Sequence, residues 1–215
     1  MEQLFRRRVE LGVKLVLLSL LLATVAALAW MVSLANATDH VGEAQAQPIP
    51  FSHKHHVGDV GLDCRFCHST VETSAFAGMP STQVCMGCHS QLFAQQGILR
   101  LLQASTASGQ PIGWRRVHSL PGFAYFDHSI HVAKGVACIE CHGRIDQMPL
   151  TWRAEKLQMD WCIGCHRDPA PHLHPRDQVF AMPAAAVSDG DAHLLLHSLQ
   201  IQSAQRLTDC STCHR

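Results

Sequence analysis

The chain has 215 residues, of which 10 are Cys and 16 are His. With 47% hydrophobic residues, the sequence is too apolar for a disordered chain. Lys plus Arg equals Asp plus Glu, at 17 each, so no global positive charge recruits nucleic acid. The excess of Cys and His is the feature to explain.

The first predicted element is a membrane-spanning helix over residues 15–35. This segment carries no charge, and as a helix it is about 31 Å long, close to the roughly 30 Å of a hydrocarbon core. Arg6, Arg7, Arg8 and Lys14 precede it. The positive-inside rule therefore places residues 1–14 in the cytoplasm and everything after the helix outside.

A cleaved signal peptide is the alternative, because residues 35–37 read Ala-Asn-Ala, the A-x-A form of a cleavage site. The apolar stretch exceeds the usual 7 to 15 residues of a signal peptide, and Trp30 suits an interfacial anchor. We therefore expect a single-pass anchor in the bacterial cytoplasmic membrane. Residues 36–50, polar and Pro-containing, are predicted to form an extended linker before a folded domain over residues 51–215.

Five C-x-x-C-H motifs in this domain use all ten cysteines. Two cysteines at this spacing can form thioethers with one haem, and the adjacent His can then reach the iron as its proximal ligand. The sequence predicts five haem c groups on the extracytoplasmic side, where bacteria attach haem c. The predicted thioether residues are Cys64, Cys67, Cys85, Cys88, Cys138, Cys141, Cys162, Cys165, Cys210 and Cys213, and the predicted proximal ligands are His68, His89, His142, His166 and His214.

Three other uses of C-x-x-C compete with haem attachment. Cys₄ zinc sites would need an even number of pairs, and they give no reason for the His after each pair. A disulfide framework also leaves the five histidines unexplained. A thioredoxin-like centre needs one C-x-x-C in a βαβ context, which this chain lacks.

An internal repeat organises the domain. Residues 51–57 and 126–132 both read F-x-H-x-x-H-V and precede a C-x-x-C-H motif. We predict two two-haem modules, residues 51–90 and 126–167, and a fifth haem at residues 210–214. Short helices are expected at residues 92–102 and 194–199.

About 33 residues per haem are too few to bury each macrocycle in a conventional core. The predicted fold class is therefore a multihaem cytochrome c in which short α-helices and loops, with little β structure, pack around haems, plus one N-terminal transmembrane helix.

The repeated histidines are candidates for the distal side of the irons. His53 with His56, and His128 with His131, are three residues apart, so each pair projects from one side of a helical turn. We predict these four as distal ligands, the alternative being surface histidines. For the fifth iron the first choice is His118, in competition with Met148, Met159 and Met182 and then with His172, His174, His193 and His197.

The repeat resembles the multihaem class III cytochromes c, in which F-x-H-x-x-H-V precedes C-x-x-C-H. The resemblance implies that His53 serves the Cys64/Cys67 haem and His128 the Cys138/Cys141 haem. It also implies that His56 and His131 cross to neighbouring haems.

The whole chain resembles the pentahaem cytochrome c subunit of bacterial alternative complex III, a quinol:electron-acceptor oxidoreductase. The resemblance rests on the anchor, the five motifs and residues 114–118, 120–121, 125–128, 147–148 and 159–162. It implies integral membrane and peripheral partner subunits, including an iron-sulfur subunit and a mono-haem cytochrome subunit. Electrons would then pass to a soluble cytochrome c or blue copper protein.

If every iron holds two protein ligands, the chain conducts electrons and has no catalytic site of its own. Two alternatives stay open. One is a stand-alone membrane-anchored multihaem quinol dehydrogenase, and the other is a multihaem reductase with one open haem. In pentahaem nitrite reductases the open haem is usually attached through a motif ending in Lys, whereas all five motifs here end in His.

Overall fold

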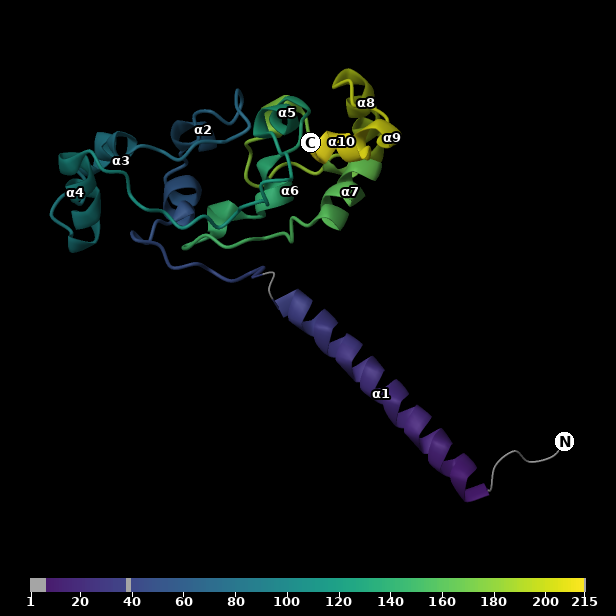
Figure 1. Cartoon of the computed structure of the whole chain (residues 1–215). Coiled ribbons are helices and arrows are strands. Elements are labelled where there is room, and N and C mark those ends of the chain that lie inside the picture. Colours follow the sequence, from purple (N-terminus) through teal and green to yellow (C-terminus); the bar gives the residue numbers. More distant parts are fainter. Residues whose placement is uncertain (1–6, 38–39, 215) are drawn as a thin grey trace. The chain divides into compact units, whose positions relative to one another are not determined.

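The computed structural model describes residues 7–37 and 40–214, which form two compact units, one up to His40 and the other from Val41 onwards. Arg6, counted in the charge asymmetry before the apolar segment, lies outside the described residues. Figure 1 traces the order of the helices along the chain.

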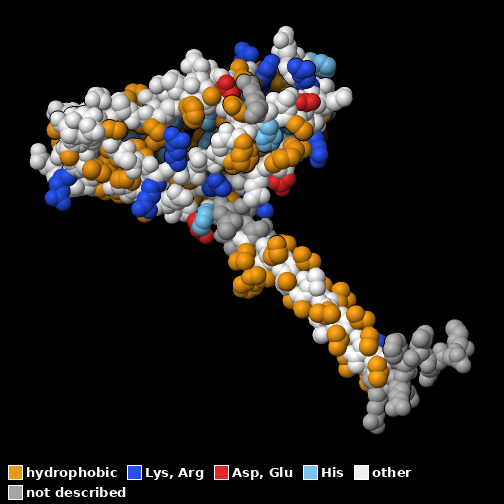
Figure 2. Space-filling model, in the orientation of Figure 1, with side chains coloured by type: hydrophobic (Ala, Val, Ile, Leu, Met, Phe, Trp, Pro, Cys, Tyr) orange, Lys and Arg blue, Asp and Glu red, His pale blue; other side chains and the backbone are white. Residues whose placement is uncertain are grey.

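The first unit is the single helix α1, Arg7–Ala37. Its apolar part, Val9–Leu34, has a mean hydropathy of 2.5, and none of it is buried within the protein. Figure 2 shows hydrophobic side chains along the visible length of the helix. Near its start, Lys14 Nζ lies 2.6 Å from Glu10 Oε1, so the basic group that precedes the apolar segment is paired. Its length and composition make α1 a candidate membrane span, as predicted, although the helix extends beyond residues 15–35 at both ends.

The second unit consists of short helices and loops. Its described residues form isolated β-bridges, such as Val41 with Arg153 and Ala44 with Trp152, and no extended strand. The helices are η1 (Lys54–Asp59), α2 (Cys64–Cys67), α3 (Thr82–His89), η2 (Gly97–Leu99), α4 (Arg100–Ser108), α5 (His128–Ala133), α6 (Cys138–His142), η3 (Ile145–Gln147), α7 (Met159–Arg167), η4 (Ala170–His172), η5 (Arg176–Gln178), α8 (Asp189–Ser198), α9 (Ala204–Leu207) and α10 (Cys210–Cys213). The predicted fold class is confirmed in its helical character.

The second half of the predicted linker is attached to this unit. Besides the two bridges, Gln47 accepts a hydrogen bond from the backbone N–H of Arg115 at 3.0 Å and donates one to its carbonyl at 2.9 Å. Ile49 is 7% exposed and belongs to the core. Residues 41–50 are therefore held along the domain surface by hydrogen bonds that the composition of the segment does not reveal.

Two predicted helices are present with shifted bounds. The apolar pattern over residues 92–102 corresponds to η2 followed by α4, which ends at Ser108, where Gly109 adopts a left-handed φ of 70°. Of the helix predicted at residues 194–199, all but the last residue belong to α8, which begins after the N-cap Ser188 and has Leu199 as its C-cap. Buried apolar side chains are few for a domain of this length, and the largest are Met148, Leu173 and Val179.

Candidate haem sites

Each C-x-x-C-H motif lies on a short helix. The helices α2 and α10 begin at the first cysteine of their motifs, and the preceding Asp63 and Asp209 cap them by accepting hydrogen bonds from the backbone N–H groups of Arg65 and Ser211. None of the ten cysteines forms a disulfide. A cap one residue before the motif fixes the helical turn that brings both thiols to one side.

The proximal histidines share one hydrogen-bonding pattern. In four of them Nδ1–H donates to a backbone carbonyl, which leaves Nε2 available for a metal. The pairs are His68 with Gly78 at 2.7 Å, His89 with Leu92 at 3.1 Å, His166 with Leu207 at 3.0 Å and His214 with Phe123 at 3.0 Å. His142 differs, because its buried Nδ1 has no hydrogen-bond partner.

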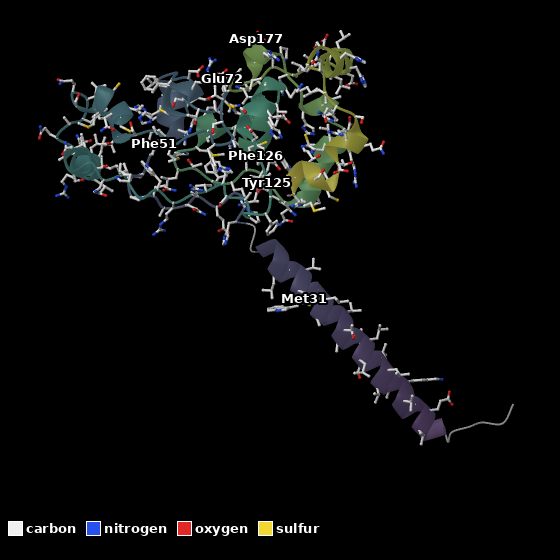
Figure 3. All side chains as sticks on the ribbon, turned by 45° about the horizontal axis from the view of Figure 1, so that its top comes forward. Met31, Phe51, Glu72, Tyr125, Phe126 and Asp177 are labelled. Carbon is white, nitrogen blue, oxygen red and sulfur yellow. The ribbon has the colours of Figure 1, made fainter. Side chains whose placement is uncertain are left out.

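The two predicted distal pairs are held by the aromatic residue of the repeat. Phe51 stacks on His56, with ring centres 4.4 Å apart, and meets His53 edge-on at 4.9 Å. Phe126 stacks on His131 at 4.5 Å and meets His128 edge-on at 4.7 Å. Both phenylalanines are labelled in Figure 3. The sequence repeat is thus also a repeat of side-chain geometry. The backbone differs, because His53 is the N-cap of the π-helix η1 and His56 lies within it, whereas His128 and His131 lie in the α-helix α5.

Three of the four predicted distal histidines face a proximal histidine. The ring centres are 6.1 Å apart for His56 and His89, 6.2 Å for His131 and His166, and 6.4 Å for His128 and His142. A metal–imidazole bond is about 2 Å long and the ring centre lies ~1.1 Å behind the nitrogen, so two imidazoles on one metal have centres about 6 Å apart. The observed separations match that spacing.

His53 lies near the first motif. Its pKa is lowered to about 4, chiefly by burial and then by the neighbouring His68. Its Nδ1 is 2.9 Å from Thr151 Oγ1, which leaves Nε2 free. The structure thus brings His53 and His68 together, and in the second module it brings His128 and His142 together.

Burial lowers the pKa of two further candidate ligands. It lowers the pKa of His142 to about 3, with a further contribution from His118, and it also lowers the pKa of His131. Neutral imidazole is the form that ligates metals, so burial favours the ligating form of these two side chains.

His118 lies in the same neighbourhood. Its ring meets that of His142 edge-on at 4.4 Å, too close for the two to share an iron from opposite sides. Its pKa is lowered to about 4 by burial and then by Arg153 and His128. Its Nε2 is buried without a hydrogen-bond partner. His118 thus contacts His142 of motif 3, whereas His214 of motif 5 contacts Phe123.

The three competing methionines differ in their surroundings. Met148 is 1% exposed in the core, and Met182 is half-buried. Met159 is 66% exposed and starts α7. Met159 precedes Cys162 by three residues and so lies on the same side of the helix. The pKa of Cys162 is raised by burial and then by Cys213 of motif 5. Of the three, Met159 is therefore the one on the helix of motif 4, exposed at its first residue.

His172 and His174 are engaged elsewhere. His172 Nδ1 is 2.7 Å from Glu140 Oε2, and His174 Nε2 is 3.1 Å from Glu140 Oε1. Glu140 is an internal residue of motif 3, so the pair ties the segment after α7 to α6. Sequence reasoning missed this role of Glu140, and no spacing signal links it to histidines more than 30 residues away.

The residues present fit haem. Paired cysteines outside any disulfide, imidazoles with Nε2 available and facing rings at metal-bridging separations form the donor set of a bis-histidine haem c. Large apolar side chains of the domain are exposed near these motifs, as expected if they contact a macrocycle. They include Phe66, Phe76, Met79, Phe93, Phe123 and Ile130.

Comparison with known proteins agrees with this donor set. The family described as "Cytochrome c7 and related cytochrome c" matches residues 49–107 and 124–215, well over half of the chain. The "Menaquinone reductase, multiheme cytochrome c subunit" of Nitratidesulfovibrio vulgaris (strain Hildenborough) is 39% identical over 125 residues, which cover 58% of this chain and 53% of the relative. The match thus spans about half the length of that relative.

Proposed function

The chain belongs to the family of cytochrome c7 and related cytochromes c, so it is a multihaem electron-transfer protein that binds haem c, and we propose that it carries five haems and conducts electrons within a membrane-bound quinol-oxidising complex. When bound, each haem supplies one iron that takes up and releases a single electron.

The observation that carries the conducting role is the set of facing imidazoles. His56, His128 and His131 each lie opposite a proximal histidine at 6.1–6.4 Å. Two imidazoles on one iron leave no open coordination position for a substrate. The chain's own residues then hold the irons, favour the neutral form of the buried imidazoles and exclude exogenous ligands.

The ligands of the first four irons follow from these pairs. We assign His53 with His68, His56 with His89, His128 with His142 and His131 with His166, a set supported by the ring separations and by the proximity of His53 to His68. For the iron held by His214, the exposed position of Met159 on the helix of motif 4 supports this thioether as the distal ligand. His118 remains a competing prediction.

The complex is proposed to be alternative complex III or a close counterpart. The relative named as a menaquinone reductase subunit supports a quinone-linked membrane assembly, and α1 supports membrane attachment, with the N-terminus in the cytoplasm and the haem domain outside. Partners would be integral membrane and peripheral subunits, including an iron-sulfur subunit and a mono-haem cytochrome. The terminal acceptor would be a soluble cytochrome c or blue copper protein.

Ligand binding and quinol oxidation test this function. The reduced, haem-loaded chain should bind neither carbon monoxide nor nitrite. The isolated chain should not be reduced by menaquinol, whereas the chain in its native membrane complex should be. Carbon monoxide or nitrite binding to the unmodified chain would favour a reductase with an open haem, and menaquinol oxidation by the isolated chain would favour a stand-alone quinol dehydrogenase.

A further inference from the structure

We propose that the five haem sites follow one another in space in the order motif 2, motif 1, motif 3, motif 4, motif 5, so that motifs 2 and 5 form the two ends of the electron path. The interpretation of this order as an electron path rests on the proposed function. The order differs from that of the motifs in the sequence. It makes the junction between motifs 1 and 3 the place where every electron passing between the two modules must cross.

Within each module, one short helix joins two sites. His53 and His56 lie at η1, and they face motif 1 and motif 2 respectively. His128 and His131 lie on α5 and face His142 of motif 3 and His166 of motif 4. Since two side chains three residues apart on one turn are neighbours, motifs 1 and 2 are adjacent, and so are motifs 3 and 4.

The modules meet through motifs 1 and 3. His128 donates from its backbone N–H and its Nδ1 to the carbonyl of Ala75, in the loop after motif 1, at 3.3 and 2.8 Å. In the other direction, His53 contacts Thr151 in the loop after motif 3, and the N–H of Lys54 donates to the carbonyl of Met148 at 3.0 Å. Each distal pair is therefore seated on the loop of the other module's first motif.

The last link joins motifs 4 and 5. Nδ1–H of His166 donates to the carbonyl of Leu207 in α9, three residues before motif 5. The helices α7 and α9 pack against each other. The N–H of Tyr125, just before the distal pair of the second module, donates to the carbonyl of Cys213 at 2.8 Å. Motif 5 is thus attached to the second module on its motif 4 side.

The arrangement of the motif helices is visible in Figure 1. The helices run across the domain as α3, α2, α6 and then α7 with α10, which correspond to motifs 2, 1, 3, 4 and 5.

The decisive experiment locates the irons. An iron anomalous-difference map from crystals of the full-length, haem-loaded protein should show motif 1 with motifs 2 and 3 as its nearest iron neighbours, and motif 3 with motifs 1 and 4. The irons of motifs 2 and 5 should each have a single near neighbour. Any other set of nearest neighbours would overturn the order.

A matched pair of variants gives a solution readout. His56→Ala creates a high-spin iron at the predicted end of the path, and His128→Ala creates one in its middle. In EPR saturation measurements, His56→Ala should speed the relaxation of one neighbouring low-spin haem, and His128→Ala should speed the relaxation of two. If both variants affected the same number of haems, the order would be contradicted. Both methods measure the positions of the irons and do not depend on enzymatic turnover. If the irons have this order but the chain in its complex receives no electrons from menaquinol, the proposed function is wrong and the order still holds.

Discussion

The imidazoles of His56 and His89 face each other with ring centres 6.1 Å apart, although the two residues belong to different helices and only one of them is part of a C-x-x-C-H motif. This separation matches that of two imidazoles bound to one metal, about 6 Å. The adjacent residue His55 has a different environment, because its Nδ1 lies 3.4 Å from Asp59 Oδ2 and its side chain is 57% exposed.

This contrast gives a matched test of the distal assignment. His56→Ala should convert one haem from low spin to high spin and let the reduced protein bind one carbon monoxide per chain, because the iron loses its sixth ligand. His55→Ala should leave all haems low spin. Optical and EPR spectra of the haem-loaded proteins measure both effects, and an unchanged spectrum in His56→Ala would show that another residue fills this position.

The fifth distal ligand is tested by removing thioethers. Met159→Leu should abolish the weak near-infrared charge-transfer band that a Met–iron bond produces, and it should lower the potential of one haem, because thioether ligation raises haem potential relative to imidazole. Met148→Leu is a matched control in which core packing changes by less than about 1.5 kcal/mol. Near-infrared magnetic circular dichroism of the three proteins is the measurement.

The same spectra decide between Met159 and His118. If the unmodified protein has no such band and His118→Ala produces a high-spin haem, then the sequence-based choice of His118 holds and the assignment of Met159 is wrong.

The contact between η1 and η3 should tolerate no side chain at Gly58. A Cβ at this position would lie 2.5 Å from the carbonyl oxygen of Asp146, which is backbone and not free to move away. Replacing Gly by Ala in a helix is ordinarily stabilising by about 0.5–1 kcal/mol, but here the clash should make Gly58→Ala destabilising by about 1–3 kcal/mol. Gly113→Ala, with no atom within 4 Å of the added Cβ, is the control for thermal unfolding.

Asp146 predicts a defined pH dependence of stability. Its carboxylate accepts hydrogen bonds from Arg144 Nε and Nη2 at 2.8 and 2.6 Å, and these bonds lower its pKa despite the opposing effect of burial. A carboxyl with a lowered folded-state pKa stabilises the fold above its unfolded value of about 3.9, and this stabilisation is lost as the pH falls through the folded value.

Thermal unfolding as a function of pH checks this dependence. Asp146→Asn should unfold at a lower temperature than the unmodified protein at pH 7, and the difference should shrink below about pH 4. The double variant Arg144→Met/Asp146→Asn should show little further loss than Asp146→Asn alone. A difference between the unmodified protein and Asp146→Asn that is constant from pH 7 to pH 3 would show that the ion pair does not contribute.

The sequence predicted the motif chemistry and the helical fold class because both depend on short-range patterns. Spacing alone placed Cys64 and Cys67 on one turn, and the repeated histidine pair was visible as a repeat. The sequence could not show that His128 hydrogen bonds to the carbonyl of Ala75, because that contact joins residues 53 positions apart. The attachment of residues 41–50 to the domain also depends on long-range hydrogen bonds, such as those between Gln47 and Arg115.

Other parts of the site depend on burial, which the sequence shows only indirectly. From the sequence, His118 is the first choice and Met148 and Met159 are its competitors, but the fold places His118 against His142, buries Met148 and leaves Met159 exposed at the start of α7. The role of Glu140 as the partner of His172 and His174 is likewise created by the path of the chain after α7.

The reciprocal seating of the two distal pairs has a consequence for how the protein matures. Each half of the repeat obtains the support for its distal histidines from the other half, through Ala75 in one direction and Thr151 in the other. During synthesis from the N-terminus, the first module is made before residues 145–151 exist, so the support for its distal histidines can be completed only after the second module has been made. The two halves of the repeat therefore depend on each other for assembly.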